Sequence, residues 1–201
     1  MAMKNLTIGI LKVLGAERVA KRRAGELVAF FENFIQKGER VLDIGGGGGW
    51  VAQALKARTG ADVTILDTRN FNQTGVNCVI YDGDAMPFED DSFYSAIIVF
   101  TLHHCQNPIK VLAEAKRVAR GKIIIIEDIT TSLLNKILLS FWDIISGLIS
   151  VIAPPGEDFY FKFYRDGEWQ KIFQGLGLKI IFQKQFQSNK TIRHKLFVLQ
   201  K

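Results

Sequence analysis

Five consecutive glycines, Gly45 to Gly49, directly follow a short apolar segment, Arg40–Ile44. The segment 50–58, which comes next, has the pattern of a helix. Because glycine has no side chain, its backbone can adopt a positive φ and approach a ligand closely. A strand, a glycine-rich turn and a helix in this order predict a nucleotide-binding corner of an α/β protein.

Strand-like and helix-like segments alternate along most of the remaining sequence. The expected strands are 61–66, 77–81, 95–101 and 121–126, and the expected helices are 17–36, 50–58, 108–119 and 166–174. This alternation is typical of a parallel sheet covered by helices. The segments 178–186 and 191–199 flank a short polar turn, so they are predicted to form an antiparallel hairpin at the end of the sheet.

The chain of 201 residues suits a single domain. Within it we expect four parts, namely N-terminal helices (1–37), a cofactor-binding core (38–128), a helical lid or insertion (129–165) and a C-terminal helix with the hairpin (166–201). The segments 133–152 and 6–14 are amphipathic. Their pattern suits packing on the sheet, a lid over an apolar acceptor or contact with a membrane surface.

The acidic residue Asp43 precedes the first glycine of the turn by two positions. A carboxylate there repels a pyrophosphate but attracts an ammonium or a sulfonium. S-adenosyl-L-methionine carries both of these cations and no phosphate. In addition, Trp50 stands where a GxGxxG dinucleotide motif that begins at Gly45 requires its last glycine. The pattern therefore favours S-adenosylmethionine over a dinucleotide.

Two further acids follow predicted strands. Asp67 ends the second strand, where a carboxylate can accept hydrogen bonds from both ribose hydroxyls, although dinucleotide sites use an acid here as well. Asp84 follows the third strand, where a carboxylate or the neighbouring backbone can take the adenine amino group. Met86 and Phe88 are candidates to flank the adenine ring.

Four stretches of the sequence, VLDIGGGGG, TILD, DGDAMPFEDDSF and AIIVFTLHHCQNP, resemble motifs of the class I S-adenosylmethionine-dependent methyltransferases. The resemblance is to the small-molecule group that includes the ubiquinone and menaquinone methylases. It covers 38–128 and extends to FYRDGEWQKIFQGLGL near the C-terminus. It implies a Rossmann-like three-layer α/β sandwich, with a seven-stranded, mostly parallel sheet and one antiparallel strand in the C-terminal hairpin.

The same resemblance implies a set of cofactor contacts. The matching positions are Asp43, Gly45, Gly46, Gly47 and Gly49 at the turn, Asp67 and Thr68 after the second strand, Gly83, Asp84 and Ala85 near the adenine, and Leu102 and His103 beside the methionine part. One segment departs from the family pattern, because 68–76 is too short and too polar for the full helix that normally follows the second strand. Arg69 or Phe71 is a candidate to line the ribose and adenine wall instead.

Methyl transfer is an in-line displacement, so alignment in a dry pocket supplies most of the catalysis. A base is needed only if the acceptor must lose a proton. We expect a small, apolar acceptor, with His104, Glu127 and Tyr160 as candidate groups near it. The alternatives are a nicotinamide-dependent oxidoreductase and a methyltransferase-like protein that binds the cofactor or a lipid without turnover.

The composition indicates which kinds of partner and which cellular compartment to expect. The net charge is +6, but aromatic residues are not interleaved with a basic stripe, so we expect no nucleic-acid partner, while peripheral contact with a membrane stays open. Two cysteines without a CxxC pair indicate reduced thiols in a cytoplasmic protein. The adjacent residues of His103-His104-Cys105 would point to opposite sides of an extended segment, so we expect no metal site there. No motif indicates the oligomeric state.

Overall fold

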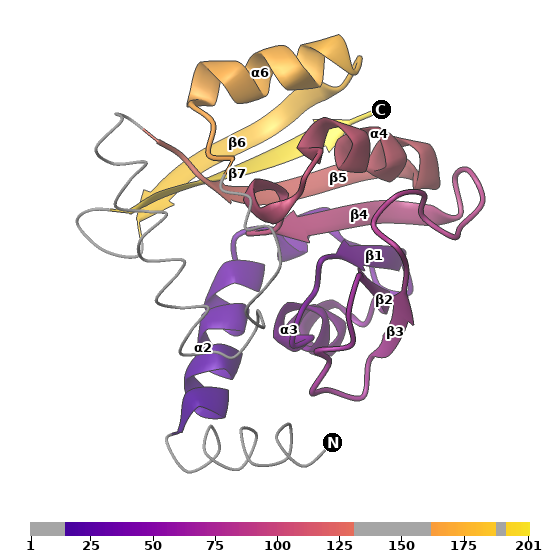
Figure 1. The fold of residues 1–201 in the computed structure, drawn as a ribbon. Coiled ribbons are helices and arrows are strands. Elements are labelled where there is room, and N and C mark those ends of the chain that lie inside the picture. Colours follow the sequence, from indigo (N-terminus) through magenta and orange to yellow (C-terminus); the bar gives the residue numbers. More distant parts are fainter. Residues whose placement is uncertain (1–14, 131–161, 188–191) are drawn as a thin grey trace.

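The computed structural model describes residues 15–130, 162–187 and 192–201 (Figure 1). A sheet of seven strands, in the order β3-β2-β1-β4-β5-β7-β6, lies between two layers of helices. Neighbouring strands from β3 to β5 pair in parallel, and β7 runs antiparallel to both β5 and β6. This confirms the predicted Rossmann-like fold, with one antiparallel strand in a C-terminal hairpin.

The elements follow the predicted order. The strands are β1 (Arg40–Ile44), β2 (Asp62–Asp67), β3 (Asn77–Ile80), β4 (Phe93–Val99), β5 (Ala119–Asp128), β6 (Lys179–Gln187) and β7 (Arg193–Gln200). The helices are α2 (Ala16–Val28), α3 (Trp50–Thr59), α4 (Pro108–Val118) and α6 (Asp166–Gly175), with 3-10 turns η1 (Glu32–Phe34) and η2 (Leu102–His104). The two amphipathic segments, the turn at 188–189 and Tyr160 lie outside the described residues.

The helix expected over 17–36 is wrong in its second half, because α2 already ends at Val28. The amide of Phe31 donates to the carbonyl of Val28, and that of Phe34 donates to the carbonyl of Phe31, so the chain continues in tighter turns of the 3-10 type. These turns place Phe31 and Ile35 in the core. Burial of these two side chains thus overrides the helical periodicity of the sequence.

Each face of the sheet has its own apolar core. Helices α4 and α6 cover one face with buried residues such as Leu112 and Trp169, while α2 and α3 cover the other with residues such as Val28 and Leu55. The isoleucines at 123–126 of β5 alternate between the two cores. Each contributes about 1.5–3 kcal/mol when fully buried. This two-sided burial explains why β5 is apolar without interruption.

The parallel strands bring their carboxyl ends to one edge of the sheet. Asp43 lies near the end of β1, Asp67 ends β2, and Glu127 and Asp128 end β5. In open α/β sheets this edge is where ligands bind. Between β2 and β3, the segment 68–76 forms no helix, as its length and polarity predict. None of the helices in the described part of the chain is long and apolar enough to cross a membrane.

Candidate functional site

The glycine turn after β1 is a close-packed bend. Gly45, Gly47 and Gly49 have positive φ angles of 71°, 51° and 80°, which residues with side chains rarely adopt. A Cβ atom on Gly45 would lie 2.1 Å from Cγ2 of Thr101, and one on Gly46 would lie 2.8 Å from Oδ2 of Asp43. Both the conformation and the packing of this turn therefore require glycine.

Asp43 is buried beneath this turn, with 1% of its surface exposed. The backbone amide of Ala52 in α3 donates to its carboxylate, but Oδ2 has no hydrogen-bond partner among the described residues. Burial, and after it the nearby charge of Asp67, raise the pKa of Asp43 from its ordinary 3.8 to about 7 against the lowering effect of the Ala52 amide. A buried carboxylate oxygen without a partner is costly, so it would gain from a cation or a donor.

Asp67 joins the end of β2 to the glycine turn. Its Oδ2 accepts a hydrogen bond from the amide of Gly47 at 2.9 Å, and its Oδ1 accepts one from the amide of Arg69 at 3.3 Å. The side chain of the next residue, Thr68, is exposed. A Cβ on Gly83 would lie 3.4 Å from Cγ2 of Thr68, so the loop after β3 reaches the end of β2.

The segment 68–76 folds back over the glycine turn. The amide of Gln73 donates to the carbonyl of Gly48 at 3.1 Å. Oδ1 of Asn72 accepts from the amide of Thr74 at 2.9 Å, and its Nδ2 donates to the carbonyl of Val76 at 2.7 Å. A Cβ on the turn's last glycine would lie 2.6 Å from both the Asn72 and the Thr74 side-chain oxygens. These contacts were not identified from the sequence, although Asn-x-Thr is a recognisable signal for an Asx turn.

The loop after β3 is anchored in the core by the apolar residues Met86 and Phe88. Met86 is buried, and its amide donates to Oε2 of Glu114 in α4 at 2.9 Å. The Phe88 ring packs edge-on against a core phenylalanine. Asp84 and Ala85 are exposed, and Asp84 forms an ion pair with Lys110. The loop thus leaves Asp84 and Ala85 on the surface while Met86 is anchored in the core.

Glu127 organises the turn η2. Its Oε1 accepts hydrogen bonds from the amides of Thr101 at 2.9 Å and Leu102 at 2.7 Å, while its Oε2 pairs with Nδ1 of His103 at 2.6 Å. Glu127, Leu102 and His103 are all buried. His104 is exposed, and its ring lies 4.0 Å from the His103 ring. The carboxylate of Glu127 therefore holds the loop that follows β4.

Phe100 and Thr101, between β4 and η2, were not identified from the sequence. Phe100 has a φ of 53°, which is uncommon for a residue with a side chain and occurs often near functional sites. This bend brings Thr101 against the glycine turn, where its hydroxyl donates to the carbonyl of Gly45 at 3.3 Å. The turns after β1 and β4 are thus in direct contact.

A second histidine–carboxylate pair lies on the opposite side of the sheet. Nδ1 of His194 in β7 pairs with Oδ1 of Asp128, and both residues are buried. The His194 ring lies 5.0 Å from the Phe100 ring and 5.2 Å from the Phe186 ring. This pair was also missed, because a pairing between residues 66 positions apart leaves no local signal in the sequence.

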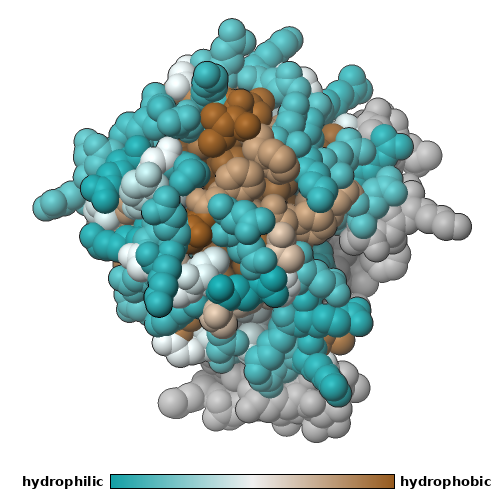
Figure 2. All heavy atoms as spheres, turned by 180° about the vertical axis from the view of Figure 1, so that it is seen from behind, coloured by the Kyte–Doolittle hydropathy of each residue, from teal (hydrophilic) through white to brown (hydrophobic). Residues whose placement is uncertain are grey.

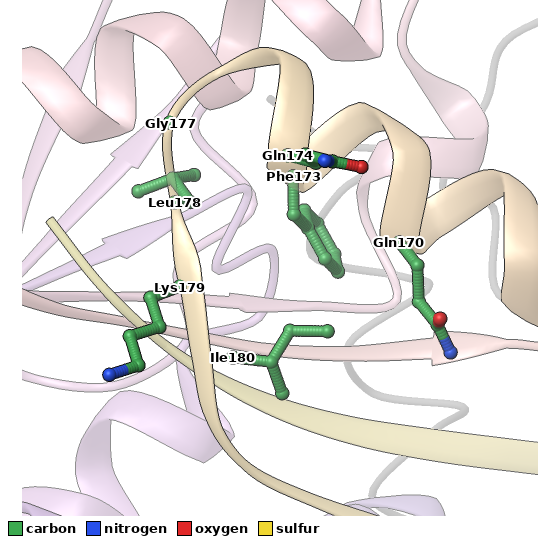
Figure 3. Close-up of a pocket in the computed structure, with 7 residues that line it drawn as sticks. All are labelled: Gln170, Phe173, Gln174, Gly177, Leu178, Lys179 and Ile180. Carbon is green, nitrogen blue, oxygen red and sulfur yellow. The ribbon is translucent and has the colours of Figure 1, made fainter.

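A hollow of about 400 Å³ lies elsewhere, between the end of α6 and the start of β6 (Figure 3). Its lining residues are Gln170, Phe173, Gln174, Gly177, Leu178, Lys179 and Ile180. In the register of the sheet, Lys179 of β6 lies opposite Gln200 of β7, and Gln200 lies opposite Lys122 near the beginning of β5. The hollow therefore lies at the amino edge of the parallel sheet, away from the glycine turn.

Comparison with known proteins gives consistent results. The sequence matches a family model described as a methyltransferase domain over residues 16–183. MJ1123, an uncharacterized protein of Methanocaldococcus jannaschii, is 37% identical over 93 residues, or 45% of either chain. The ubiquinone/menaquinone biosynthesis C-methyltransferase UbiE of Geotalea uraniireducens is 28% identical over 190 residues, which cover 82% of this chain and 79% of that protein. The chain spans less than half the length of the first curated relatives that it matches.

The fold is also found in solved structures. Geranyl diphosphate methyltransferase, solved in complex with S-adenosylmethionine, superposes with a TM-score of 0.67 at 11% identity, over 92% of this chain and 86% of that one. At this identity the likeness concerns the fold alone. Because the family model covers well over half of the sequence, the protein belongs to the methyltransferase domain family.

Proposed function

We propose that this protein binds S-adenosylmethionine at the glycine turn and transfers its methyl group to a small, apolar acceptor. The observation that supports this proposal best is the buried Oδ2 atom of Asp43, which has no partner among the described residues. It lies directly beneath a turn whose glycines leave backbone exposed to a ligand. The site thus offers an anionic acceptor where a cationic cofactor would gain most.

The charges of the site favour this cofactor over a dinucleotide. Asp43 is buried and Asp67 is half-buried beside the same turn. Two unit charges about 4 Å apart interact by about 4 kcal/mol at an effective dielectric constant of about 20. At such a distance a pyrophosphate would meet repulsion of up to this order from each acid in its ionised form, whereas an ammonium or sulfonium would meet attraction. This difference disfavours the nicotinamide-dependent alternative.

Each part of the cofactor would be held by a different group of residues around the turn. Asp43 with Gly45, Gly46, Gly47 and Gly49 would hold its cationic end, and Asp67 with Thr68 would hold the ribose. Gly83, Asp84 and Ala85 would contact the adenine, and Leu102 with His103 would contact the methionine part. When bound, the cofactor supplies a methyl group on a positively charged sulfur.

The three candidate residues near the acceptor would have different roles. Both oxygens of Glu127 are engaged by η2, so we assign it the role of positioning Leu102 and His103 beside the cofactor. His104 is exposed next to this turn and is the better candidate to face an acceptor. Tyr160 stays a candidate from the sequence. An apolar acceptor agrees with the name of the UbiE relative, a C-methyltransferase of ubiquinone/menaquinone biosynthesis.

Calorimetric titration tests the cofactor. We expect S-adenosylmethionine to bind the wild type, NAD to give no heat, and Asp43→Ala to weaken S-adenosylmethionine binding at least tenfold, since hydrogen bonds to charged groups contribute about 1.5–3 kcal/mol. Asp62→Asn, at an exposed aspartate of β2, is the matched control and should bind like the wild type. Undiminished binding by Asp43→Ala would refute the assignment.

Turnover separates an enzyme from a protein that only binds the cofactor. Purified protein is incubated with S-adenosylmethionine and an organic extract of cells, and S-adenosylhomocysteine is measured by mass spectrometry. The enzyme should form it only when the extract is present, because the acceptor is apolar. Binding without extract-dependent product would favour the non-catalytic alternative.

A further inference from the structure

The C-terminal part of the chain is rich in positive charge. From Trp169 to Lys201 the sequence contains seven Lys and Arg residues and no Asp or Glu. This stretch carries a charge of +7, whereas residues 1–26 carry +4 and residues 27–168 carry −5, which gives the net +6 of the chain. Most of it belongs to the hairpin of β6 and β7, with β6 at the edge of the sheet. The hairpin is therefore basic, and of its lysines Lys195 is buried in an ion pair with Asp166 while Lys179 and Lys184 are exposed.

An apolar surface lies on the same hairpin. It consists of Phe30 and Phe34, from the connection after α2, and Ile181, Phe182 and Phe186 of β6, which together we call the phenylalanine patch. Phe30 stacks on Phe186 at 4.2 Å between ring centroids, and Phe34 packs on Phe182 at 5.1 Å. Ile181 is 42% exposed and Phe182 is 38% exposed. Figure 2 shows a continuous apolar area on this side of the molecule, bordered by hydrophilic residues.

Exposed lysine side chains lie within and beside the phenylalanine patch. Lys184 lies between Phe182 and Phe186 in β6 and on the same side of the strand, and its Nζ atom is 5.0 Å from the centre of the Phe30 ring. Lys179, at the start of β6, is also exposed. A surface that combines exposed apolar side chains with lysines suits an anionic lipid bilayer, where the rings enter the interface and the ammonium groups meet the phosphates.

The patch continues toward the candidate site. The Phe186 ring contacts His194 at 5.2 Å, and the His194 ring contacts Phe100 at 5.0 Å. Phe100 is followed by Thr101, whose hydroxyl donates to the carbonyl of Gly45 in the glycine turn. A line of aromatic rings thus connects the exposed edge of the sheet with the proposed cofactor site.

We propose that the phenylalanine patch docks on an anionic membrane surface, and that this contact gives the site access to an acceptor dissolved in the lipid. The access to an acceptor in the lipid rests on the proposed function, whereas the docking itself does not. The charge of the hairpin disfavours a second copy of the chain, because two such hairpins would repel each other. Nucleic acid is disfavoured because the ring of Phe30 is already stacked on Phe186 instead of being open to a base.

Vesicle sedimentation with the full chain tests the docking. We expect the wild type to bind phosphatidylcholine vesicles that contain phosphatidylglycerol, and to bind pure phosphatidylcholine vesicles much more weakly. Phe182→Ser should lower the affinity for anionic vesicles about tenfold, and Lys184→Gln about fivefold, since one lysine near such a surface contributes about 1 kcal/mol. Ile109→Ser, at an exposed isoleucine of α4, is the matched control and should bind like the wild type.

Titration with S-adenosylmethionine, together with assays of RNA binding and of dimerisation, distinguishes the outcomes. Each variant is titrated with S-adenosylmethionine, and unchanged affinity shows that it is folded and that the cofactor site is intact whatever the vesicles show. Absence of binding to anionic vesicles, or equal binding by Phe182→Ser, would overturn the proposal. So would RNA binding or dimerisation that Phe182→Ser abolishes while vesicle binding persists, since the patch would then serve a different partner.

Discussion

The substitution Asp43→Asn is expected to stabilise the free protein at alkaline pH and to weaken cofactor binding. Asp43 ionises at about pH 7 in the folded protein and at its ordinary 3.8 in the unfolded chain. Between these values the unfolded chain releases a proton that the folded protein keeps, so the stability of the wild type falls as the pH rises from about 4 to about 7. Asparagine does not ionise and avoids this loss.

The size of the effect follows from the shift in pKa. A rise from 3.8 to about 7 corresponds to about 3 units, and each unit to about 1.4 kcal/mol. At pH 8 the variant should therefore be more stable than the wild type by up to about 4 kcal/mol, and at pH 4 the difference should vanish. The amide can still accept the hydrogen bond from Ala52, so the packing is conserved.

Urea unfolding of both proteins at several pH values between 4 and 8 measures this difference directly. Asp62→Asn, at an exposed position of β2, is the control and should be as stable as the wild type at every pH, because it keeps Asp43. Titration of Asp43→Asn with S-adenosylmethionine should show affinity reduced by at least tenfold. A difference in stability that stays constant from pH 4 to pH 8 would contradict the burial argument, whatever the cofactor does.

Three other substitutions test the surroundings of the turn. Gly45→Ala should abolish cofactor binding in calorimetry, because its Cβ would lie 2.1 Å from Cγ2 of Thr101 and its φ is 71°. Glu127→Ala should lower the free energy of urea unfolding by about 2–4 kcal/mol, since it leaves two amides and His103 without their buried partner. Asn72→Ala should weaken S-adenosylmethionine binding about tenfold with little loss of stability, because it removes the Asx turn that holds 68–76 against the glycines.

Matched controls accompany these variants. Gly25→Ala lies in α2 with no atom within 4 Å of the added Cβ, so it should stabilise the protein by about 0.5–1 kcal/mol. Glu26→Ala removes an exposed carboxylate and should change the stability by less than about 1 kcal/mol. Asn77→Ala, at an exposed asparagine of β3, should leave cofactor affinity unchanged. If Gly45→Ala bound the cofactor like the wild type, the turn would not be the site.

The strands, the glycine turn and the acids beside it could be predicted because their signals are local. Apolar runs mark β1 and β5, and Asp43 stands next to the glycines that it supports. The partners of Glu127 could not be predicted, since they are set by the way β5 lies beside the end of β4. The exposure of Phe182 depends on β6 being at the edge of the sheet, which the apolar pattern of the hairpin does not reveal.

The carboxyl end of β5 also limits how this protein can change in evolution. Glu127 and Asp128 are neighbours in the chain, and each bonds a different histidine, His103 and His194, on opposite faces of the sheet. Because side chains alternate along a strand, inserting or deleting one residue in β5 would turn both acids to the wrong face at once. Homologues that keep both histidines should therefore conserve the length of β5 and place their insertions in the loops.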